Sequence, residues 1–181
     1  FVTVNGRWEG QKPHLLTFEN PCLTKEEIQL NKNAGIRKNF NGKLTFCFVG
    51  RLEKSKGIHE LLKAVNDLGV IDWIDKLHCV GEDHGRKKNE RINFPNNISI
   101  NFHGLLDREY LNQIYKESHF IILPSQSEGF PKVLAEASSF GCIPIVASIP
   151  SIKEHINADN YNGILITDFS INAISKSIHY I

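Results

Sequence analysis

The sequence predicts an α/β domain with a mainly parallel, doubly wound sheet and helices on both of its faces. Three observations lead to this prediction. From Lys43 onward, short apolar runs alternate with amphipathic stretches of about a dozen residues, the pattern of βαβ units. Right-handed crossovers then place helices on both faces of the sheet, as in Rossmann-like domains. With 181 residues, 41% of them hydrophobic, the chain is long enough to bury one such core.

Six apolar runs are the predicted strands of this sheet. Each run has four to six residues, and most are rich in the β-branched and aromatic side chains that favour strands. In chain order they are Leu44–Val49, Leu77–Val80, Ile98–Phe102, Phe120–Leu123, Ile143–Val146 and Gly163–Ile166. Because parallel sheets bind ligands beyond the carboxyl ends of their strands, we expect Gly50, Gly81, Gly104 and the turn 125–129 to line one rim.

Five stretches between and after these runs are the predicted helices. Apolar residues recur at helical spacing from Ile58 to Leu68. The next helix follows Asp107, a favourable N-cap, and presents Leu111 and Tyr115 on one face. The last three helices are expected around Val133–Phe140, over Ser151–Ile156 and over Asn172–Tyr180.

Residues 1–42 do not follow this alternation. They contain one predicted helix, from Thr24 to Asn33, which opens with the capping-box pair Thr24 and Glu27. We interpret residues 1–42 as a connector from an N-terminal domain that lies outside this sequence, and residues 43–181 as the α/β domain. The sequence contains no methionine, even at position 1, which fits a piece of a longer protein.

Composition and charge exclude several classes of protein. A net charge of +1 offers no basic stripe for nucleic acid, and no apolar run is long enough to span a membrane. The basic patch at Arg86–Lys88 with Arg91 is predicted to be a solvated loop; the alternative is contact with an anionic membrane surface or with a charged ligand. The four cysteines form no C-x-x-C pair, so we expect no metal site and a reducing, cytoplasmic setting.

The segment 125–137 carries the main functional signal. Glu128 lies in a turn after a strand, Pro131 suits the first turn of a helix, and Glu136 follows inside that helix. A strand end, a glycine turn and a helix start together present unpaired N–H groups, which form a phosphate site. Carboxylates beside a phosphate can accept hydrogen bonds from sugar and ribose hydroxyls. The segment therefore predicts a nucleotide-sugar site. In the alternative interpretation, the helix dipole alone favours Glu128, and Glu136 faces solvent.

A second group of residues, Gly50 to Gly57, follows the first strand and opens the next helix. Arg51 and Lys56 are then placed on the same rim as Glu128, where both can reach a diphosphate. Their chemical value would be to stabilise the charge that develops on a nucleoside-diphosphate leaving group. The alternative is a solvated, lysine-rich turn. Neither a G-x-G-x-x-G nor a Walker motif occurs, which argues against dehydrogenases and NTPases.

Taken in order, these landmarks resemble the donor-binding domain of family 4 glycosyltransferases. The landmarks are Gly50-Arg51, Lys56-Gly57, Val80-Gly81, Phe102-His103-Gly104 and the pair Glu128 and Glu136. The resemblance covers about residues 43–181. It implies the GT-B architecture, in which two Rossmann-like domains face a cleft, and a retaining enzyme that needs no bound metal or other cofactor.

The resemblance also implies a role for each matching residue. Arg51 and Lys56 would hold the donor diphosphate, Glu128 the hydroxyls of the donor sugar, and Glu136 the ribose hydroxyls. We count Glu128, Arg51 and Lys56 as the catalytic candidates. The remaining substrate-binding candidates are the rim and turn residues Gly50, Gly129 and Pro131, the N–H groups of Phe130, Lys132 and Val133 at the distal phosphate, and Leu106 at the base.

The sequence departs from the family pattern at two places. Pro131 stands where glycine is common, and Ser138 stands where a bulkier apolar residue often follows Ala137. The acceptor domain and its catalytic residues are missing from these residues, so this chain should bind donor weakly and transfer nothing alone. The expected partners are a nucleotide-diphosphate-sugar and a saccharide or glycoconjugate acceptor. We expect the enzyme in the cytoplasm, with peripheral contact at the cytosolic face of a membrane as an option.

Two other functions stay open at this point. A nucleotide-sugar epimerase of the same fold would need its catalytic carboxylates in the absent domain, and it does not predict Arg51 and Lys56 together with the glutamate pair. A non-catalytic nucleotide-binding module of the receiver type would want an acidic cluster at the first strand end, where this chain has Gly50-Arg51. His103 lies at the rim and is expected to be structural. No motif encodes the base, the sugar or the acceptor.

Overall fold

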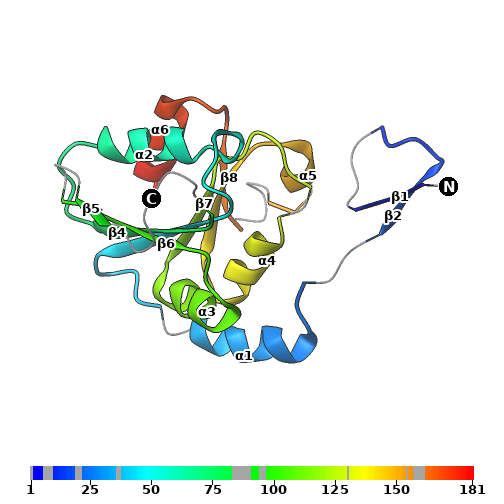
Figure 1. Ribbon diagram of the computed structural model, residues 1–181, viewed down its shortest axis with the longest axis horizontal. Helices are drawn as coiled ribbons and strands as arrows, with labels where there is room; N and C mark the ends of the chain where they lie inside the picture. The colour runs from blue at the N-terminus through cyan, green and yellow to red at the C-terminus, as the bar shows by residue number, and fades with distance from the viewer. Residues whose placement is uncertain are drawn as a thin grey trace.

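The computed structural model describes most of the chain, with short gaps. The described residues are 2–5, 10–18, 22–35, 38–82, 91–93, 97–129, 131–153, 155–156 and 162–181. Their main feature is a seven-stranded sheet (Figure 1). Its strands are β3 (Leu44–Val49), β4 (Ile74–Val80), β5 (Arg91–Asn93), β6 (Ser99–Gly104), β7 (Phe120–Leu123), β8 (Ile143–Ala147) and β9 (Ile164–Ile166).

The order of the strands identifies the place where a ligand should bind. Across the sheet the order is β5-β6-β4-β3-β7-β8-β9, and only β5 runs antiparallel to its neighbour. The chain therefore builds outward from β3 in one direction and then from β7 in the other. Residues Phe46 and Cys47 of β3 pair with Phe120 and Ile121 of β7. In such sheets the crevice at this reversal, beyond the carboxyl ends of the two strands, is the ligand site.

Helices cover both faces of the sheet, as predicted (Figure 1). The helices are α1 (Lys25–Gly35), α2 (Ile58–Asn66), α3 (Arg108–Glu117), α4 (Lys132–Ser139), α5 (Pro150–Lys153) and α6 (Ile171–His179), with a short 3-10 helix η1 (Lys54–Lys56). Helices α2 and α6 pack together on one face, and α3 and α4 lie on the other with α1 against α4. The predicted doubly wound α/β fold is confirmed.

Local sequence signals explain why several helices begin where they do. The Asp107 side chain accepts a hydrogen bond from the Tyr110 amide at 3.0 Å, which caps α3 as predicted. In the predicted capping box, the Glu27 side chain accepts from the Thr24 amide at 2.7 Å, and the Thr24 hydroxyl accepts from the Glu27 amide at 3.1 Å. The core lies between the sheet and these helices, and every residue of β3 is buried.

Some predicted boundaries and one loop were wrong. Arg91, placed in a solvated loop, lies in β5 and pairs with Asn101 of β6, so this segment extends the sheet; residues 86–88 lie outside the described residues. Pro131 is the N-cap of α4, one residue before the helix starts. The short helix predicted to reach Ile156 ends at Lys153.

Residues 1–42 contain two strands that were not predicted. β1 (Val2–Asn5) and β2 (Leu15–Phe18) form a separate, parallel two-stranded sheet. The predicted helix is present as α1. Hydrogen bonds attach α1 to the α/β domain: the Asn31 side-chain amide donates to the Ser139 hydroxyl at 2.9 Å.

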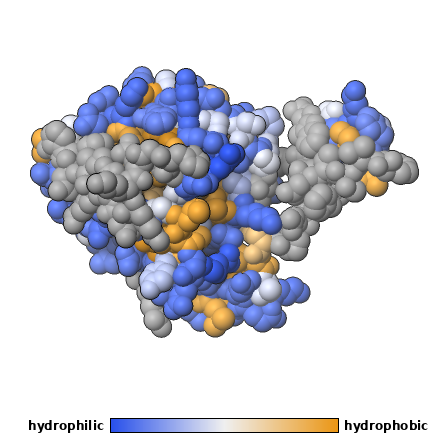
Figure 2. Space-filling view, in the orientation of Figure 1, coloured by the Kyte–Doolittle hydropathy of each residue, from blue (hydrophilic) through white to orange (hydrophobic). Residues whose placement is uncertain are grey.

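The face shown in Figure 2 is mostly hydrophilic, with apolar side chains gathered near the centre of the view, above α3. Large apolar side chains that stay exposed near this helix include Leu105, at 66%, and Tyr110. Among the helices that the structure describes, none has the length and apolar character needed to cross a membrane.

Candidate functional site

Two loops meet beyond the carboxyl ends of β3 and β7, where doubly wound sheets have their ligand crevice. The loop after β3 contains η1, and the loop after β7 leads to α4. The Gln126 amide donates to the Ser55 carbonyl oxygen at 3.1 Å, which joins the loops directly. Gly57 makes this approach possible because it has a φ of +74°, and a Cβ atom there would lie 2.3 Å from the Pro124 carbonyl oxygen. Only glycine fits this contact.

The predicted rim of strand ends is also present. The Gly50 amide donates to the Val80 carbonyl oxygen at 2.9 Å, and the Gly81 amide donates to the Gly104 carbonyl oxygen at 2.9 Å. Gly81 has a φ of +145°, and a Cβ atom there would lie 1.8 Å from the Gly50 carbonyl oxygen. The ends of β3, β4 and β6 are therefore held close together by direct backbone contacts.

Lys56 and Glu128 form an ion pair across the two loops. The Lys56 ammonium donates to Glu128 Oε1 at 2.6 Å, and the two side chains are 20% and 16% exposed. The Ser151 hydroxyl donates to the Glu128 carbonyl oxygen at 2.8 Å, so the backbone of this turn is held as well. For Lys56 the alternative of a solvated turn is therefore wrong, and the structure joins two predicted site residues that are distant in sequence.

Arg51 is placed differently from Lys56. Its side chain is 66% exposed, and its guanidinium lies 3.1 Å from Glu53 Oε1 in the same loop. Exposed pairs of this kind contribute little to stability. Arg51 thus stands at the rim, as predicted, but the structure does not hold it against Glu128 as it holds Lys56.

Glu136 is buried, which overturns the alternative in which it faces solvent. Its Oε1 accepts a hydrogen bond from Arg108 at 2.8 Å, and its Oε2 accepts one from the Tyr115 hydroxyl at 3.3 Å. Burial first, and then the charge of Glu136, raises the pKa of Tyr115 well above its usual range. The hydroxyl therefore stays protonated and acts as a donor to the carboxylate.

The start of α4 follows the loop after β7 and supplies backbone donors. Helix α4 begins at Lys132, and its first turn includes Val133. The first amides of a helix have no acceptor within the helix, and they lie at the positive end of its dipole. Lys132 is exposed, and Gly129 of the preceding turn is exposed too. Phe130, whose amide was predicted to join this group, lies outside the described residues.

Leu106 and His103 occupy the far end of the rim. Leu106 is partly buried and packs against the core, whereas its neighbour Leu105 is exposed. His103 Nε2 lies 2.8 Å from His78 Nδ1. Burial, together with the charges of His103 and Lys76, lowers the pKa of His78 to about 4. At neutral pH the contact of His78 with Glu117, at 3.7 Å, is therefore not a salt bridge.

Sequence reasoning missed the two partners of Glu136. Arg108 is the first residue of α3, and Tyr115 lies two turns further along the same helix. Tyr115 was predicted as a core residue, and it is fully buried. Its hydroxyl contact and the Arg108 contact depend on how α3 packs beside α4, for which the sequence contains no local signal.

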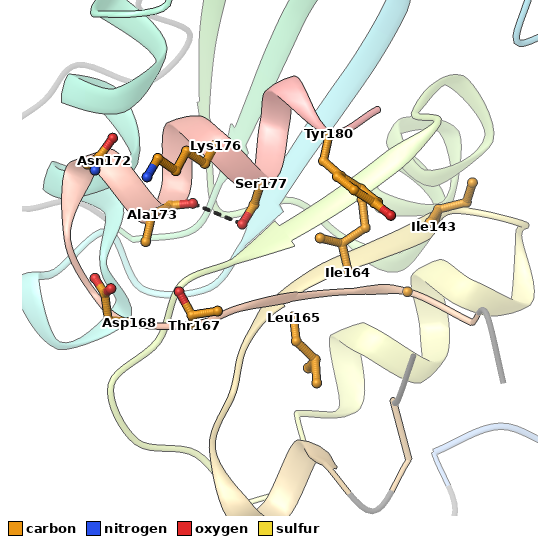
Figure 3. A pocket seen from close by; sticks show the side chains of 11 residues that line it. Ile143, Ile164, Leu165, Thr167, Asp168, Asn172, Ala173, Lys176, Ser177 and Tyr180 are labelled. Atoms are coloured by element: carbon orange, nitrogen blue, oxygen red, sulfur yellow. Dashed lines mark hydrogen bonds between the residues drawn. The ribbon is translucent and has the colours of Figure 1, made fainter. Parts of the chain in front are cut away.

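A cavity of about 620 Å³ lies away from this crevice, between β9 and α6 (Figure 3). The side chains of Tyr180, Ile164 and Ile143 lie toward one end of it, and Asp168 and Asn172 toward the other. Among the described residues, those that line it belong to the β8, β9 and α6 region and not to the two loops. Within the same described ranges, no group of three or more His, Cys, Asp or Glu residues is arranged to hold a metal ion.

Comparisons with known proteins identify the family of this chain. The family model "Glycosyl transferases group 1" matches residues 31–181. An uncharacterized glycosyltransferase of Methanocaldococcus jannaschii is 35% identical over 162 residues, which cover 86% of this chain and 41% of the relative. An uncharacterized glycosyltransferase of Haemophilus influenzae is 33% identical over 155 residues, which cover 82% of this chain and 43% of the relative. The chain thus spans less than half the length of these relatives.

Solved structures share the fold. Sucrose-phosphate synthase from Thermosynechococcus elongatus superposes with a TM-score of 0.65 at 23% identity, covering 92% of this chain and 43% of that one. Anabaena HepE in complex with UDP-glucose superposes with a TM-score of 0.64 at 18% identity, covering 94% of this chain and 49% of that one. The family match covers most of the described α/β domain, including both loops of the crevice. The chain therefore belongs to the group 1 glycosyltransferases.

Proposed function

We propose that this chain is the donor-binding half of a retaining glycosyltransferase. The enzyme would transfer a sugar from a nucleotide-diphosphate-sugar to a saccharide or glycoconjugate acceptor. The observation that carries the proposal is the Lys56–Glu128 pair, which places a cation and a carboxylate side by side at the strand-order reversal. A serotype-specific mannosyltransferase of Escherichia coli is among the relatives, at 28% identity, which supports the transfer of a sugar.

In this proposal the diphosphate occupies the positive part of the crevice. The first amides of α4, at Lys132 and Val133, would bind one phosphate, and the Phe130 amide would join them. Lys56 would contact the phosphates as a compact charge, and Arg51 could turn from Glu53 to add a bidentate contact. These cations would stabilise the negative charge that grows on the leaving nucleoside diphosphate. The basic groups and the helix terminus would thereby make a bound metal unnecessary.

The two carboxylates would bind the two sugars of the donor. Glu128 would accept hydrogen bonds from hydroxyls of the transferred sugar, and Glu136 from the ribose hydroxyls. The backbone at Gly50 and Gly129 would allow the donor to approach closely, and Pro131 would fix the entry to α4. Leu106, together with the exposed Leu105, would contact the base.

The acceptor and the residues that complete catalysis would come from a further domain. The relatives are more than twice as long as the matched region, which supports a second domain facing this one across a cleft. Alone, residues 43–181 should bind the donor weakly and transfer no sugar. The four cysteines are free thiols, which supports placing the enzyme in the reducing cytoplasm.

Calorimetric titration with UDP, GDP and ADP tests the proposal. One nucleotide should bind selectively, and Lys56→Ala should weaken its binding by about 10- to 100-fold, since a charge-assisted contact contributes roughly 1.5–3 kcal/mol. Lys54→Ala is the matched control, because Lys54 lies in the same short helix but is exposed. Equal affinities for wild type, Lys56→Ala and Lys54→Ala would refute the proposed phosphate contact.

A further inference from the structure

We propose that Arg108 and Tyr115 of α3 are positioning residues for Glu136. Their hydrogen bonds to this carboxylate determine how much the ribose hydroxyls contribute to the affinity of the site. The inference rests on the proposed function, in which Glu136 accepts hydrogen bonds from the ribose. Neither α3 residue was predicted from the sequence to hold Glu136. Both act through Glu136.

The contacts of Glu136 are divided evenly between its two oxygens. Arg108 donates to Oε1 at 2.8 Å, and Tyr115 donates to Oε2 at 3.3 Å. With both oxygens held from α3, the carboxylate cannot rotate about its last bond without losing a contact. Helices α3 and α4 lie beside each other below the sheet (Figure 1), so two rigid elements fix the group.

Two donors leave half of the hydrogen-bonding capacity of the carboxylate free. An ionised carboxylate offers about four acceptor positions, of which Arg108 and Tyr115 occupy two. One position then remains on each oxygen. This number matches the two neighbouring hydroxyls of a ribose, which would each donate to one oxygen.

Charge and burial give the arrangement its energetic basis. The Glu136 side chain is 11% exposed, and a buried carboxylate without a partner is costly. Arg108 supplies the compensating charge at hydrogen-bond distance, while its second contact, with Glu27 of α1, is longer at 3.8 Å. Arg108 is therefore bound to Glu136 first and to the N-terminal helix second.

The backbone of Glu136 is held from the opposite side as well. The Ser139 hydroxyl donates to the Glu136 carbonyl oxygen at 2.6 Å and accepts from the Asn31 side chain of α1 at 2.9 Å. This contact fixes the helix but not the carboxylate. Among the described residues, the two α3 contacts are the ones that hold the carboxylate oxygens, which makes them separable by experiment.

The test compares a nucleoside diphosphate with its 2′-deoxy and 3′-deoxy forms, using whichever of UDP, GDP and ADP wild type binds best. Wild type should prefer the ribonucleotide by about tenfold, the ratio for a good hydrogen bond to a charged acceptor. Tyr115→Phe should reduce this ratio several-fold while keeping the ring, which stacks on Phe140 at 5.9 Å. Arg108→Gln should reduce it further, and Arg108→Lys should restore part of it.

Matched controls separate positioning from general damage. Tyr110→Phe removes a hydroxyl from an exposed tyrosine of the same helix, and Glu27→Gln removes the weaker contact of Arg108. Both should keep the wild-type ratio. Circular dichroism melts verify folding, and Arg108→Gln provides the answer if Tyr115→Phe does not fold, because Arg108 is 46% exposed.

The outcomes distinguish this inference from the function on which it rests. If wild type prefers the ribonucleotide and the Arg108 and folded Tyr115 variants keep the full preference, positioning by α3 is wrong although the donor site stands. If wild type binds nucleotide without preferring ribose, Glu136 does not recognise the hydroxyls and the inference is overturned. If wild type binds none of the three nucleotides, the proposed function itself fails.

Discussion

The two glutamates of the crevice, Glu128 and Glu136, carry the same group in different surroundings. Glu128 lies in a loop, and its partner is the flexible side chain of Lys56 at 2.6 Å. Glu136 lies inside α4, and both of its oxygens accept hydrogen bonds from the neighbouring helix α3. A phosphate that attracts Lys56 would leave Glu128 to find another donor, whereas Glu136 keeps its partners throughout.

This difference assigns the two carboxylates different tasks in the proposed site. Glu136 is arranged before a ligand arrives, so binding there requires little ordering. Glu128 gains a free oxygen only when the donor phosphate competes for Lys56. The sugar contact is then coupled to the phosphate contact, and the ribose contact is independent of it.

The largest expected effect is a loss of stability at the two loops that hold Lys56 and Glu128. Gly57→Ala should lower the free energy of unfolding by about 3 kcal/mol, because it adds strain at positive φ and a backbone clash. The Cβ atom would lie 2.3 Å from the Pro124 carbonyl oxygen, so the loops must separate and Lys56 must leave Glu128. Urea denaturation measures the loss.

Gly69→Ala is the control for Gly57→Ala. Gly69 has nearly the same φ, +73°, but a Cβ atom there meets nothing within 4 Å. Gly69→Ala should lower the free energy of unfolding by the backbone strain alone, about 1 kcal/mol. Equal losses for the two variants would show that the loops do not need the close contact.

A second prediction concerns the loss of stability of the domain in acid, away from the two glutamates. Burial lowers the pKa of His78 to about 4, whereas in the unfolded chain it is near 6.5. Between these values the unfolded chain binds the proton first, so the contribution of neutral His78 is complete above pH 6.5 and is lost as the pH falls toward 4. The loss amounts to at most about 3 kcal/mol.

Denaturation midpoints at several pH values between 7.5 and 4.5 measure this effect. The groups facing His78 are His103 at 2.8 Å, Glu117 at 3.7 Å, and the charges of Lys76 and Asp75. A His78→Gln variant should show a flatter pH profile than wild type in this window. A profile unchanged by the substitution would contradict the assignment of this acid sensitivity to His78.

The smallest expected effects are changes in ligand affinity when each of the two glutamates is replaced by glutamine. Glu128→Gln should lower the affinity for a nucleotide sugar by a few-fold relative to the affinity for the nucleoside diphosphate. The affinity for the diphosphate should stay the same or rise, because the substitution releases Lys56. Glu136→Gln should weaken both ligands about equally, because both contain the ribose. The effects correspond to about 1 kcal/mol each. Calorimetric titrations with both ligands measure them, and the reverse pattern would exchange the roles of the two glutamates.

The fold could be predicted because its strands are continuous apolar runs. A buried parallel strand such as β3 shows its burial in nearly every residue, and the glycine after it marks its end. β5 was missed because it is short, polar and at the sheet edge, where pairing with β6 depends on tertiary contact and not on local pattern. Strands β1 and β2 were missed because each has only four residues, and they pair with each other outside the strand–helix alternation that predicts the main sheet.

The candidate site could be predicted only where loops at strand ends define it. The turn at Glu128 and the basic residue Lys56 follow strand ends, so parallel strands alone bring them to one rim. The contacts of Glu136 with Arg108 and Tyr115 require the relative placement of α3 and α4. That placement comes from side-chain packing across many residues, which no short motif records.

The central claim is that the nucleotide binds between the two loops and the start of α4. Backbone amide chemical shifts in NMR spectra, followed during titration with UDP, GDP and ADP, test it most directly. The account predicts that one nucleotide shifts the amides of Gly57, Lys132 and Val133 and leaves those of Lys176 and Ser177, at the β9–α6 cavity, unchanged. Shifts confined to that cavity, or no shifts with any of the three nucleotides, would contradict the account.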